Sequence, residues 1–320
     1  MLYFKYAQKY YMKNGKPTSE VEGIQLAIRE LRKLYGDILV DSFGPTSLKT
    51  FRGAMINRNL ARTTINKQCR RVLRMFRWAV SENIVRPETL TALQSVPGLK
   101  AGRSPAREPE RVKPVSEEEL EAIKPYLNPV IDAMVMVQKL TGMRPGEVVG
   151  LRTCDIDFSD RIWTFRPPSH KMQHHQKDRV IFFGPLAQEV LTPWLKKSDP
   201  TAYLFSPAEA EKIRHAQMRA SRKSKVQPSQ QDRSLSNPRK KPGDSYSVVS
   251  YRRAISYACK KAGVKAWHPN QLRHLAATNL RRELGIEVAK AVLGHTSIDV
   301  TEIYAEKDAT IARDAMARLG

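Results

Sequence analysis

The first hundred residues carry apolar side chains at helical spacing, which predicts a mainly α-helical region. Helices are expected over residues 19–35, 45–58 and 63–83, and a Pro-Thr-Ser sequence at residues 17–19 supplies a start signal for the first. The third segment has the clearest pattern, because its apolar positions form one continuous stripe. The stripe consists of Ile65, Cys69, Val72, Leu73, Phe76, Ala79 and Val80.

The opposite face of residues 63–83 is basic. It carries five cationic side chains, Lys67, Arg70, Arg71, Arg74 and Arg77. A helix of this kind can bury its apolar side and lay its basic side on the phosphates of DNA. The alternative is a basic face that only water and salt contact. We expect contact with DNA, and the alternative stays open at this point.

Residues 98–114 interrupt the helical pattern and predict a domain boundary. This stretch is rich in Pro, Gly and Arg and has no apolar period, as expected for an extended basic linker. Directly after it, Ser116 and Glu119 have the spacing of a capping box, which starts a helix. The prediction is a helical domain over residues 1–97, a basic linker over 98–114 and a second domain over 115–320.

The second domain mixes helical and strand-like segments. A strongly apolar, buried helix is expected over residues 129–140, and a short helix is expected near Pro145. Further strands are expected over residues 154–158, 161–165 and 179–183, and further helices over 246–262, 269–283 and 286–293. Residues 206–245 form a basic insertion that begins as a helix and continues as a mobile loop. The expected fold class is mainly α with a small antiparallel β-sheet, as a helical domain plus a mixed α/β domain.

Charge and cysteine content narrow the class of protein. The chain has 55 Lys and Arg against 32 Asp and Glu, a formal net charge of +23, which favours a nucleic-acid partner. Its 3 cysteines are far apart, so neither a disulfide framework nor a cysteine zinc site is expected. Neither a signal peptide nor a membrane-spanning apolar window is found, which predicts a cytoplasmic protein without a membrane partner.

The second domain also holds the side chains that suit chemistry on a phosphate. Arg144 lies between a glycine turn and a helix start, where its planar fork can point at a phosphate, and Glu147 is one turn further on, placed to hold Arg144. Lys171 lies between the second and third expected strands. The remaining candidates follow near the end of the chain: His268, Asn270, Arg273, His274, His295 and Tyr304. Taken one at a time, each of them is also a common surface or core residue.

The order of these residues is more specific than any one of them. The run from Thr141 to Glu147, the lysine between strands, the Leu-Arg-His and Leu-Gly-His sequences and the final tyrosine resemble the catalytic domain of the tyrosine recombinases, the phage integrase family. The resemblance runs from residue 116 to the end of the chain, including the nine-residue interval between His295 and Tyr304. More loosely, residues 1–97 resemble the family's core-binding domain, and no separate arm-type domain is expected before residue 1.

The resemblance implies a role for each matching residue. Arg144 and Arg273 would clamp the scissile phosphate, and His295 would hydrogen-bond to it. Lys171 would protonate the leaving 5′ oxygen, and Tyr304 would be the nucleophile. No metal or other cofactor is implied.

One position departs from the family pattern. Three residues before the second arginine the family usually has histidine, and this chain has Asn270. Asparagine donates a hydrogen bond but does not shuttle a proton. Asn270 is expected to fill that position with a positioning role, and His268, two residues earlier across Pro269, is the alternative. His268, His274 and Glu147 are otherwise expected to support the phosphate-binding residues from behind.

The implied function is site-specific DNA recombination through a 3′-phosphotyrosine, without metal or ATP. The expected partners are double-stranded DNA and other copies of the chain: a homotetramer in the synaptic complex, and a monomer or weak dimer off DNA. Association with the nucleoid in the cytoplasm would follow. Two alternatives stay open, a type IB topoisomerase-like enzyme and a catalytically impaired DNA-binding regulator, the second because of Asn270. A histidine metal site at His170, His174 and His175 is less favoured than phosphate contact.

Overall fold

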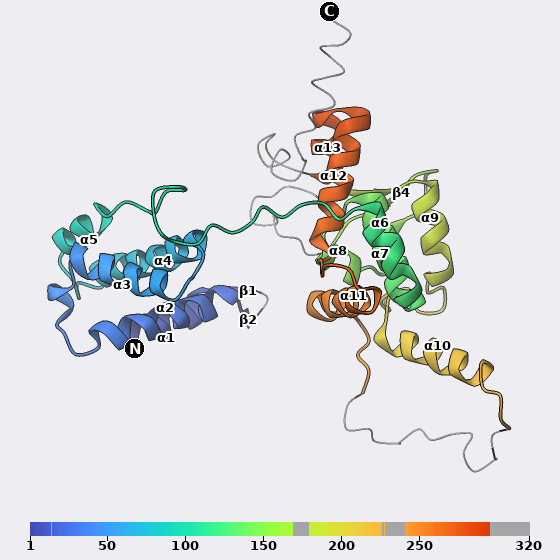
Figure 1. Ribbon diagram of the computed structural model, residues 1–320, viewed down its shortest axis with the longest axis horizontal. Coiled ribbons are helices and arrows are strands. Elements are labelled where there is room, and N and C mark those ends of the chain that lie inside the picture. Colours follow the sequence, from blue (N-terminus) through green and yellow to red (C-terminus); the bar gives the residue numbers. More distant parts are fainter. Residues whose placement is uncertain (14, 169–178, 226, 228–240, 295–320) are drawn as a thin grey trace, which may run out of the picture. The chain divides into compact units, whose positions relative to one another are not determined.

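A computed structural model of the chain describes residues 1–13, 15–168, 179–225, 227 and 241–294. The chain divides into two compact units, Met1–Arg111 and Val112–Gly320, each with its own core (Figure 1). Among the described residues, none of the helices combines the length and the apolar character needed to cross a bilayer. The localisation stays a prediction.

The described part of unit 1 is helical, with one short antiparallel hairpin (Figure 1). Its elements are α1 (Leu2–Tyr10), β1 (Met12–Lys13), β2 (Lys16–Pro17), α2 (Ser19–Tyr35), the 3-10 turn η1 (Val40–Ser42), α3 (Pro45–Asn57), α4 (Arg62–Ser81) and α5 (Pro87–Gln94). The three helices expected from apolar periodicity are present, and α2 has the expected bounds.

Helix α4 is central to the core of unit 1. Ile65, Val72 and Phe76 are each no more than 2% exposed and lie in one apolar cluster with Phe51 of α3. The stripe expected for this segment is therefore its buried side. The helix ends before Asn83, whose φ of 55° lies in the left-handed region, so it is slightly shorter than predicted.

Two helices of unit 1 were not expected from the apolar pattern. Apart from the buried Ala7, the core contacts of α1 are mainly aromatic. Tyr3 and Tyr6 pack on Trp78 of α4, with ring centroids 5.4 and 5.5 Å from that of Trp78. Tyrosines and lysines alternate along α1, so it lacks the aliphatic stripe on which the prediction depends. The short helix α5 starts at Pro87 and buries only Leu93 fully.

Most of the range expected to be a linker is attached to unit 1. The side-chain amide of Asn66 donates to the Leu99 carbonyl and its oxygen accepts from the Leu99 N–H, both at 2.9 Å. Arg62 forms an ion pair with Glu108, and Ala106 is 6% exposed within the core cluster. The first unit thus extends beyond residue 97, because polar side chains of α4 hold the chain that follows.

Unit 2 combines helices with a three-stranded antiparallel sheet of order β3-β4-β5 (Figure 1). Its helices are α6 (Glu117–Ile123), α7 (Pro129–Thr141), α8 (Pro145–Val149), α9 (Pro185–Leu191), α10 (Pro207–Ala220), α11 (Val248–Ala262), α12 (Asn270–Leu284) and α13 (Ile286–Leu293). The strands are β3 (Ile156–Asp157), β4 (Trp163–Phe165) and β5 (Ile181–Phe183), and the 3-10 turns are η2 (Lys124–Tyr126), η3 (Thr153–Asp155) and η5 (Thr192–Trp194). The expected fold class, mainly α with a small antiparallel sheet, is confirmed.

Local signals fix several ends of these helices. Ser116 and Glu119 form the expected capping box: the Glu119 N–H donates to the Ser116 hydroxyl at 3.2 Å, and the Ser116 N–H donates to the Glu119 carboxylate at 3.0 Å. Asn128 caps α7, and Gly142 ends it with φ of 62°. Helix α7 is buried on most sides, as its apolar sequence predicts.

The strands are shorter than expected and the basic insertion is partly described. Residues 154 and 155 lie in η3 rather than in a strand, and Arg152 pairs there with Asp155 at 2.8 Å. The insertion begins as α10, which packs Ala210 into the core of unit 2. Residues 228–240 of the insertion lie outside the described residues.

Candidate active site

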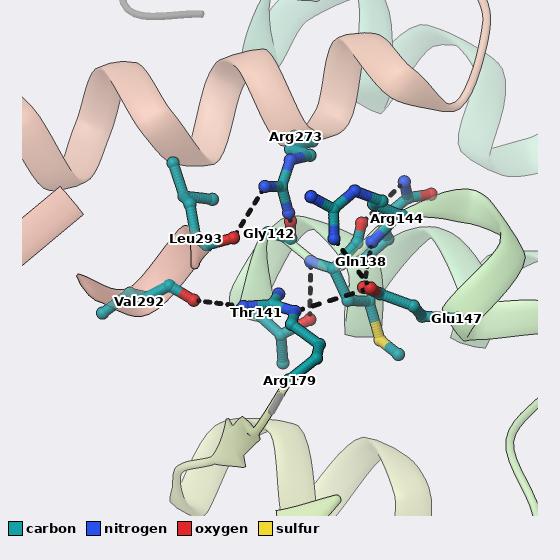
Figure 2. Close-up of polar contacts among 10 residues, drawn as sticks. Gln138, Thr141, Gly142, Arg144, Glu147, Arg179, Arg273, Val292 and Leu293 are labelled. Carbon is teal, nitrogen blue, oxygen red and sulfur yellow. Dashed lines mark hydrogen bonds and ion pairs between the residues drawn. The ribbon is translucent and has the colours of Figure 1, made fainter. Parts of the chain in front are cut away.

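Arg273 lies at the meeting point of three helices in unit 2. It belongs to α12, is 1% exposed, and donates from Nη1 to the Gly142 carbonyl and from Nη2 to the Leu293 carbonyl, both at 2.7 Å (Figure 2). Gly142 caps α7 and Leu293 is the last residue of α13. Carbonyls at helix C-termini lack partners within the helix and carry partial negative charge, so a guanidinium satisfies both needs.

Glycines allow the two helix ends to approach this closely. Gly142 and Gly294 have φ of 62° and 63°, a left-handed conformation that favours glycine. A Cβ on Gly142 would lie 2.6 Å from Cδ2 of Leu293, and a Cβ on Gly294 would lie 2.6 Å from Nη1 of Arg179. The Thr-Gly and Leu-Gly sequences therefore interlock, and side chains at either glycine would push the two ends apart.

Arg144 is held by Glu147 at the start of α8. The main-chain N–H of Arg144 donates to Oε2 of Glu147 at 2.7 Å, and Nη1 of Arg144 donates to Oε1 at 3.0 Å (Figure 2). The Arg144 side chain is 25% exposed, whereas Glu147 is 6% exposed. Since Gly142 is only two residues before Arg144, the bond from Arg273 to Gly142 brings the two arginines to one place.

Arg179 is a third arginine at this place, and the sequence pattern did not single it out. It is 7% exposed, lies 3.4 Å from Oε1 of Glu147 through Nε, and donates from Nη1 to the Val292 carbonyl at 3.1 Å. Burial lowers the pKa of Arg179 below its ordinary value; the Glu147 carboxylate opposes this and the Arg144 guanidinium adds to it. The only hint in the sequence is a cation directly before the apolar run of β5.

The charges gathered here do not cancel. Figure 2 shows the guanidinium groups of Arg144, Arg179 and Arg273 around the end of α7, with Glu147 as the acidic partner of the first two. These four described side chains carry three positive charges and one negative charge, an excess of two. Such an excess in a largely buried place favours binding of an anion with several acceptor oxygens, of which a phosphate is the most common.

The start of α12 carries the residues that depart from the family pattern. Asn270 is the first residue of the helix, and its Nδ2 lies 3.4 Å from Nε2 of His274, which is 6% exposed. His268 precedes the helix, and its main-chain N–H donates to the Gln271 side chain at 3.1 Å. Burial lowers the pKa of His268, and the nearby Arg252 charge lowers it further.

Three of the expected catalytic residues, Lys171, His295 and Tyr304, lie outside the described residues, as do His170, His174 and His175. Gly294, the last described residue, directly precedes His295 in the sequence. Within the described residues, His, Cys, Asp and Glu side chains do not gather in threes as a metal site would require. The structure thus brings together Arg144, Glu147 and Arg273 of the expected set.

In unit 1 the basic face of α4 lines a groove of about 520 Å³ with Glu20 of α2. Glu20 accepts from Arg71 at 3.0 and 2.7 Å and also pairs with Arg74. Arg71 is 15% exposed, and its guanidinium lies against Gly23, where a Cβ would collide with it. Arg71 therefore joins α2 to α4, whereas Lys67, Arg70 and Arg77 are exposed. The five residues of this face thus fall into two groups.

Comparison with known proteins identifies the family to which the chain belongs. The model of the phage integrase family matches residues 115–310, which cover most of unit 2 and include all the candidate catalytic residues. The chain belongs to the phage integrase family. The enzyme class expected from the sequence, a tyrosine recombinase, is confirmed at the level of the family.

Relatives that match over most of their own length support the same family assignment. Tyrosine recombinase XerC of Corynebacterium glutamicum is 23% identical over 302 residues, which are 91% of this chain and 82% of that protein. Tyrosine recombinase XerD of Ralstonia nicotianae is 25% identical over 268 residues, 80% of this chain and 72% of that protein.

Solved structures share the fold. The Tn1549 transposon integrase in complex with transposon right end DNA aligns with a TM-score of 0.67 at 18% identity, over 99% of this chain and 98% of that chain. A lambda integrase dimer bound to a COC′ core site aligns with a TM-score of 0.64 at 14% identity, over 95% and 93%.

Alanine at Gly142 is expected to destabilise the integrase more than alanine at Gly263, which ends α11 with φ of 72°. Both changes place a side chain in the left-handed region, at a cost of about 1–2 kcal/mol. A Cβ at Gly263 would meet nothing within 4 Å, whereas at Gly142 it would collide with Leu293, and overpacking adds about 1–3 kcal/mol. Urea unfolding followed by circular dichroism measures the difference. Equal losses would contradict the interlocking of the two glycine turns.

Glu20→Gln is expected to weaken the packing of α2 on α4 by about 1–2 kcal/mol at neutral pH, because hydrogen bonds to charged groups are lost. Hydrogen bonds from Arg71, and secondarily from Arg74, hold the pKa of Glu20 below its ordinary 4.5. The unfolded chain therefore takes up this proton first, so the stabilisation is present above about pH 4.5 and is lost as pH falls through the lower folded pKa. Amide hydrogen exchange of α2 and α4 at pH 7 and pH 4 checks this.

The matched control for Glu20 is Glu22→Gln, at an exposed position on the same helix. It should leave the exchange rates of α2 and α4 unchanged at both pH values. If the two variants exchange alike, Glu20 does not join these helices.

Proposed function

We propose that this integrase cuts and rejoins DNA at specific sites through a 3′-phosphotyrosine on Tyr304, and that the reaction uses neither metal nor ATP. The observation that carries the proposal is the convergence of Arg144 and Arg273 on the end of α7, with positive charge in excess. The family match supports recombination as the reaction class.

Catalysis of phosphoryl transfer depends mainly on positioning of the reacting groups and on stabilisation of the charge that builds on the phosphate. The Tyr304 phenol oxygen attacks phosphorus, a phosphorus–oxygen bond to tyrosine forms, and the bond to the 5′ oxygen breaks. Lys171 gives a proton to the departing 5′ oxygen, and the phenol proton leaves to solvent or a nearby base. The reverse attack by a 5′ hydroxyl reseals the strand. The energy of the phosphodiester is kept in the phosphotyrosine, so ATP has no step to drive.

Arg144 and Arg273 are proposed to bind the non-bridging oxygens of the phosphate. Nη1 and Nη2 of Arg273 donate to the Gly142 and Leu293 carbonyls. These two bonds fix the guanidinium before DNA arrives, so little reorganisation is needed as charge builds on the phosphate. Preorganised donors of this kind are typically worth on the order of 10²–10³ in rate.

Asn270 is proposed to fill the position of the family's histidine. Its place in the first turn of α12, one turn before Arg273, supports this assignment. His268 lies outside that helix with its main chain bound to Gln271, which disfavours the alternative. His295 is proposed as a further donor to the same phosphate.

Double-stranded DNA is the proposed partner of both units. The net charge of +23 and the exposed Lys67, Arg70 and Arg77 support contacts with the phosphate backbone in unit 1. Structures of the Tn1549 and lambda integrases contain DNA, and the lambda structure holds a dimer. Four copies around two duplexes, with a monomer or weak dimer off DNA, are proposed for this integrase.

Tyr304→Phe is expected to abolish a covalent protein–DNA adduct that the unaltered integrase forms. The substrate is a nicked duplex from the DNA that flanks the coding gene, because the short strand diffuses away after cleavage and traps the adduct. The adduct, seen as a band that resists denaturing electrophoresis, should persist with EDTA and without ATP.

The control is Tyr126→Phe, at an exposed tyrosine of η2. It should form the adduct at an unchanged rate. Tight, specific DNA binding by the unaltered chain without adduct formation would instead favour the regulator. Supercoil relaxation without strand exchange between two sites would favour the topoisomerase-like enzyme.

Asn270→His is expected to keep or raise the rate of adduct formation, since histidine also donates to a phosphate oxygen. Asn270→Ala should lower the rate by roughly 10-fold or more, because a preorganised donor is lost. His268→Ala should change it little. Single-turnover cleavage at saturating DNA measures all three, and a large loss in Asn270→His would show that the family position lies elsewhere.

A further inference from the structure

Arg179 is more deeply buried than its known contacts explain. At 7% exposure it belongs to a residue type that is almost never buried unless it is paired. Its single acidic neighbour in the described part of the chain is Glu147, which already binds Arg144 with both oxygens. Within the part of the chain that the structure describes, the Nε and Nη2 atoms of Arg179 are buried and have no hydrogen-bond partner.

The contacts of Arg179 with the described residues do not offset the cost of burying its charge. Removal of a guanidinium from water is costly in free energy. The Glu147 carboxylate, which Arg179 shares with Arg144, offsets little of that cost. The like charge of Arg144 adds to the penalty. An apolar side chain of similar length would fill the same space without a charge. The charge and its directional hydrogen bonds therefore have another use.

The contacts of Arg179 join segments that are far apart in the sequence. Through Nε it faces the carboxylate that orients Arg144, and through Nη1 it binds the carbonyl of Val292 in the last turn of α13, 113 residues away (Figure 2). Gly294, at the end of that turn, leaves room for Nη1, because a Cβ there would lie 2.6 Å from it. Arg179 thus contacts both Glu147 and the end of α13.

We propose that Arg179 is a positioning residue for strand cleavage, which holds the Glu147–Arg144 pair against the C-terminal end of α13. This inference rests on the proposed function, because its readout is DNA cleavage. Arg144 then points at the phosphate in a fixed direction, and the end of α13 at Gly294 keeps a fixed position relative to Arg144. In this proposal Arg179 acts through Glu147 and the end of α13, and not by its own contact with DNA.

The test compares Arg179→Met and Arg179→Lys with the unaltered integrase on the nicked substrate described above. Arg179→Met keeps the length and removes the charge; it should slow adduct formation at saturating DNA on the order of 10²-fold, as expected for small misplacement of a reacting group. The Kd for an intact duplex should stay within threefold. Arg179→Lys restores the charge with fewer donors and should recover part of the rate.

The matched control is Arg152→Met. Arg152 is also in unit 2 and is also paired, with both Asp155 oxygens at 2.8 and 3.1 Å. Among the described residues it bonds neither to Glu147 nor to the end of α13. Its loss should leave the cleavage rate at saturating DNA unchanged. This control separates the removal of any paired arginine from the removal of Arg179.

A second measurement separates positioning from simple structural support. If Arg179 acts through Glu147, the fold-losses of Arg179→Met and Glu147→Gln should not multiply in the double variant, since both remove the same alignment. Multiplying losses would overturn the proposal. So would an unchanged cleavage rate in Arg179→Met, a loss confined to Kd, or failure of both Arg179 variants to fold.

Failure of the proposed function and failure of the role of Arg179 give different results. If the unaltered integrase forms no adduct on any duplex from the flanking DNA, the proposed function fails whatever Arg179 does. If the unaltered integrase forms the adduct and Arg179→Met forms it equally fast, only the role of Arg179 is wrong.

Discussion

The packing of unit 2 depends on one buried cation, Arg273, and on the two main-chain carbonyls that it binds. Helices α7 and α13 end where their last carbonyls have no partner of their own, and the guanidinium supplies the missing donors to both. Loss of this side chain would leave two buried acceptors unsatisfied as well as remove a charge. A single residue thus links the packing of the unit to the place where its positive charge gathers. Structural and chemical effects of changes at Arg273 are therefore difficult to separate, whereas Arg144, Asn270 and Arg179 allow sharper tests.

Apolar periodicity predicted the elements whose buried side is aliphatic. Residues 19–35 and 286–293 were expected as helices, and α2 and α13 have those bounds. Helix α1 was missed because its core contacts come from tyrosines between lysines, which a count of aliphatic positions does not register. The chain around Leu99 was expected to be free of unit 1, but Asn66 binds it from α4. Such long-range polar contacts leave no periodic trace in a sequence.

In the candidate site, too, some residues could be predicted from the sequence and others could not. The order of motifs identified Arg144, Glu147 and Arg273, and the structure brings them together. Arg179 gave no comparable signal, since a lone cation before a strand is common and its importance comes only from where Val292 and Glu147 lie. On α4, five basic residues look equivalent in the sequence, but Glu20 binds two of them, Arg71 and Arg74. These two arginines therefore hold α2 against α4, whereas the other three basic residues are exposed. For Arg179 and for the basic residues of α4 alike, a partner on another helix determines what each side chain does.

The short stretch between the two units has a consequence for how DNA is released. Glu108 is bound by Arg62 within unit 1, and the Lys113 carbonyl accepts from Gln271 within unit 2. Five peptide steps between these anchors reach at most about 18 Å. If both units bind DNA as proposed, so short a tether keeps a detached unit at high effective concentration near the same duplex while the other stays bound. Release of the protein from DNA then requires both units to be detached at the same time, which lengthens its residence on DNA without tighter binding by either unit.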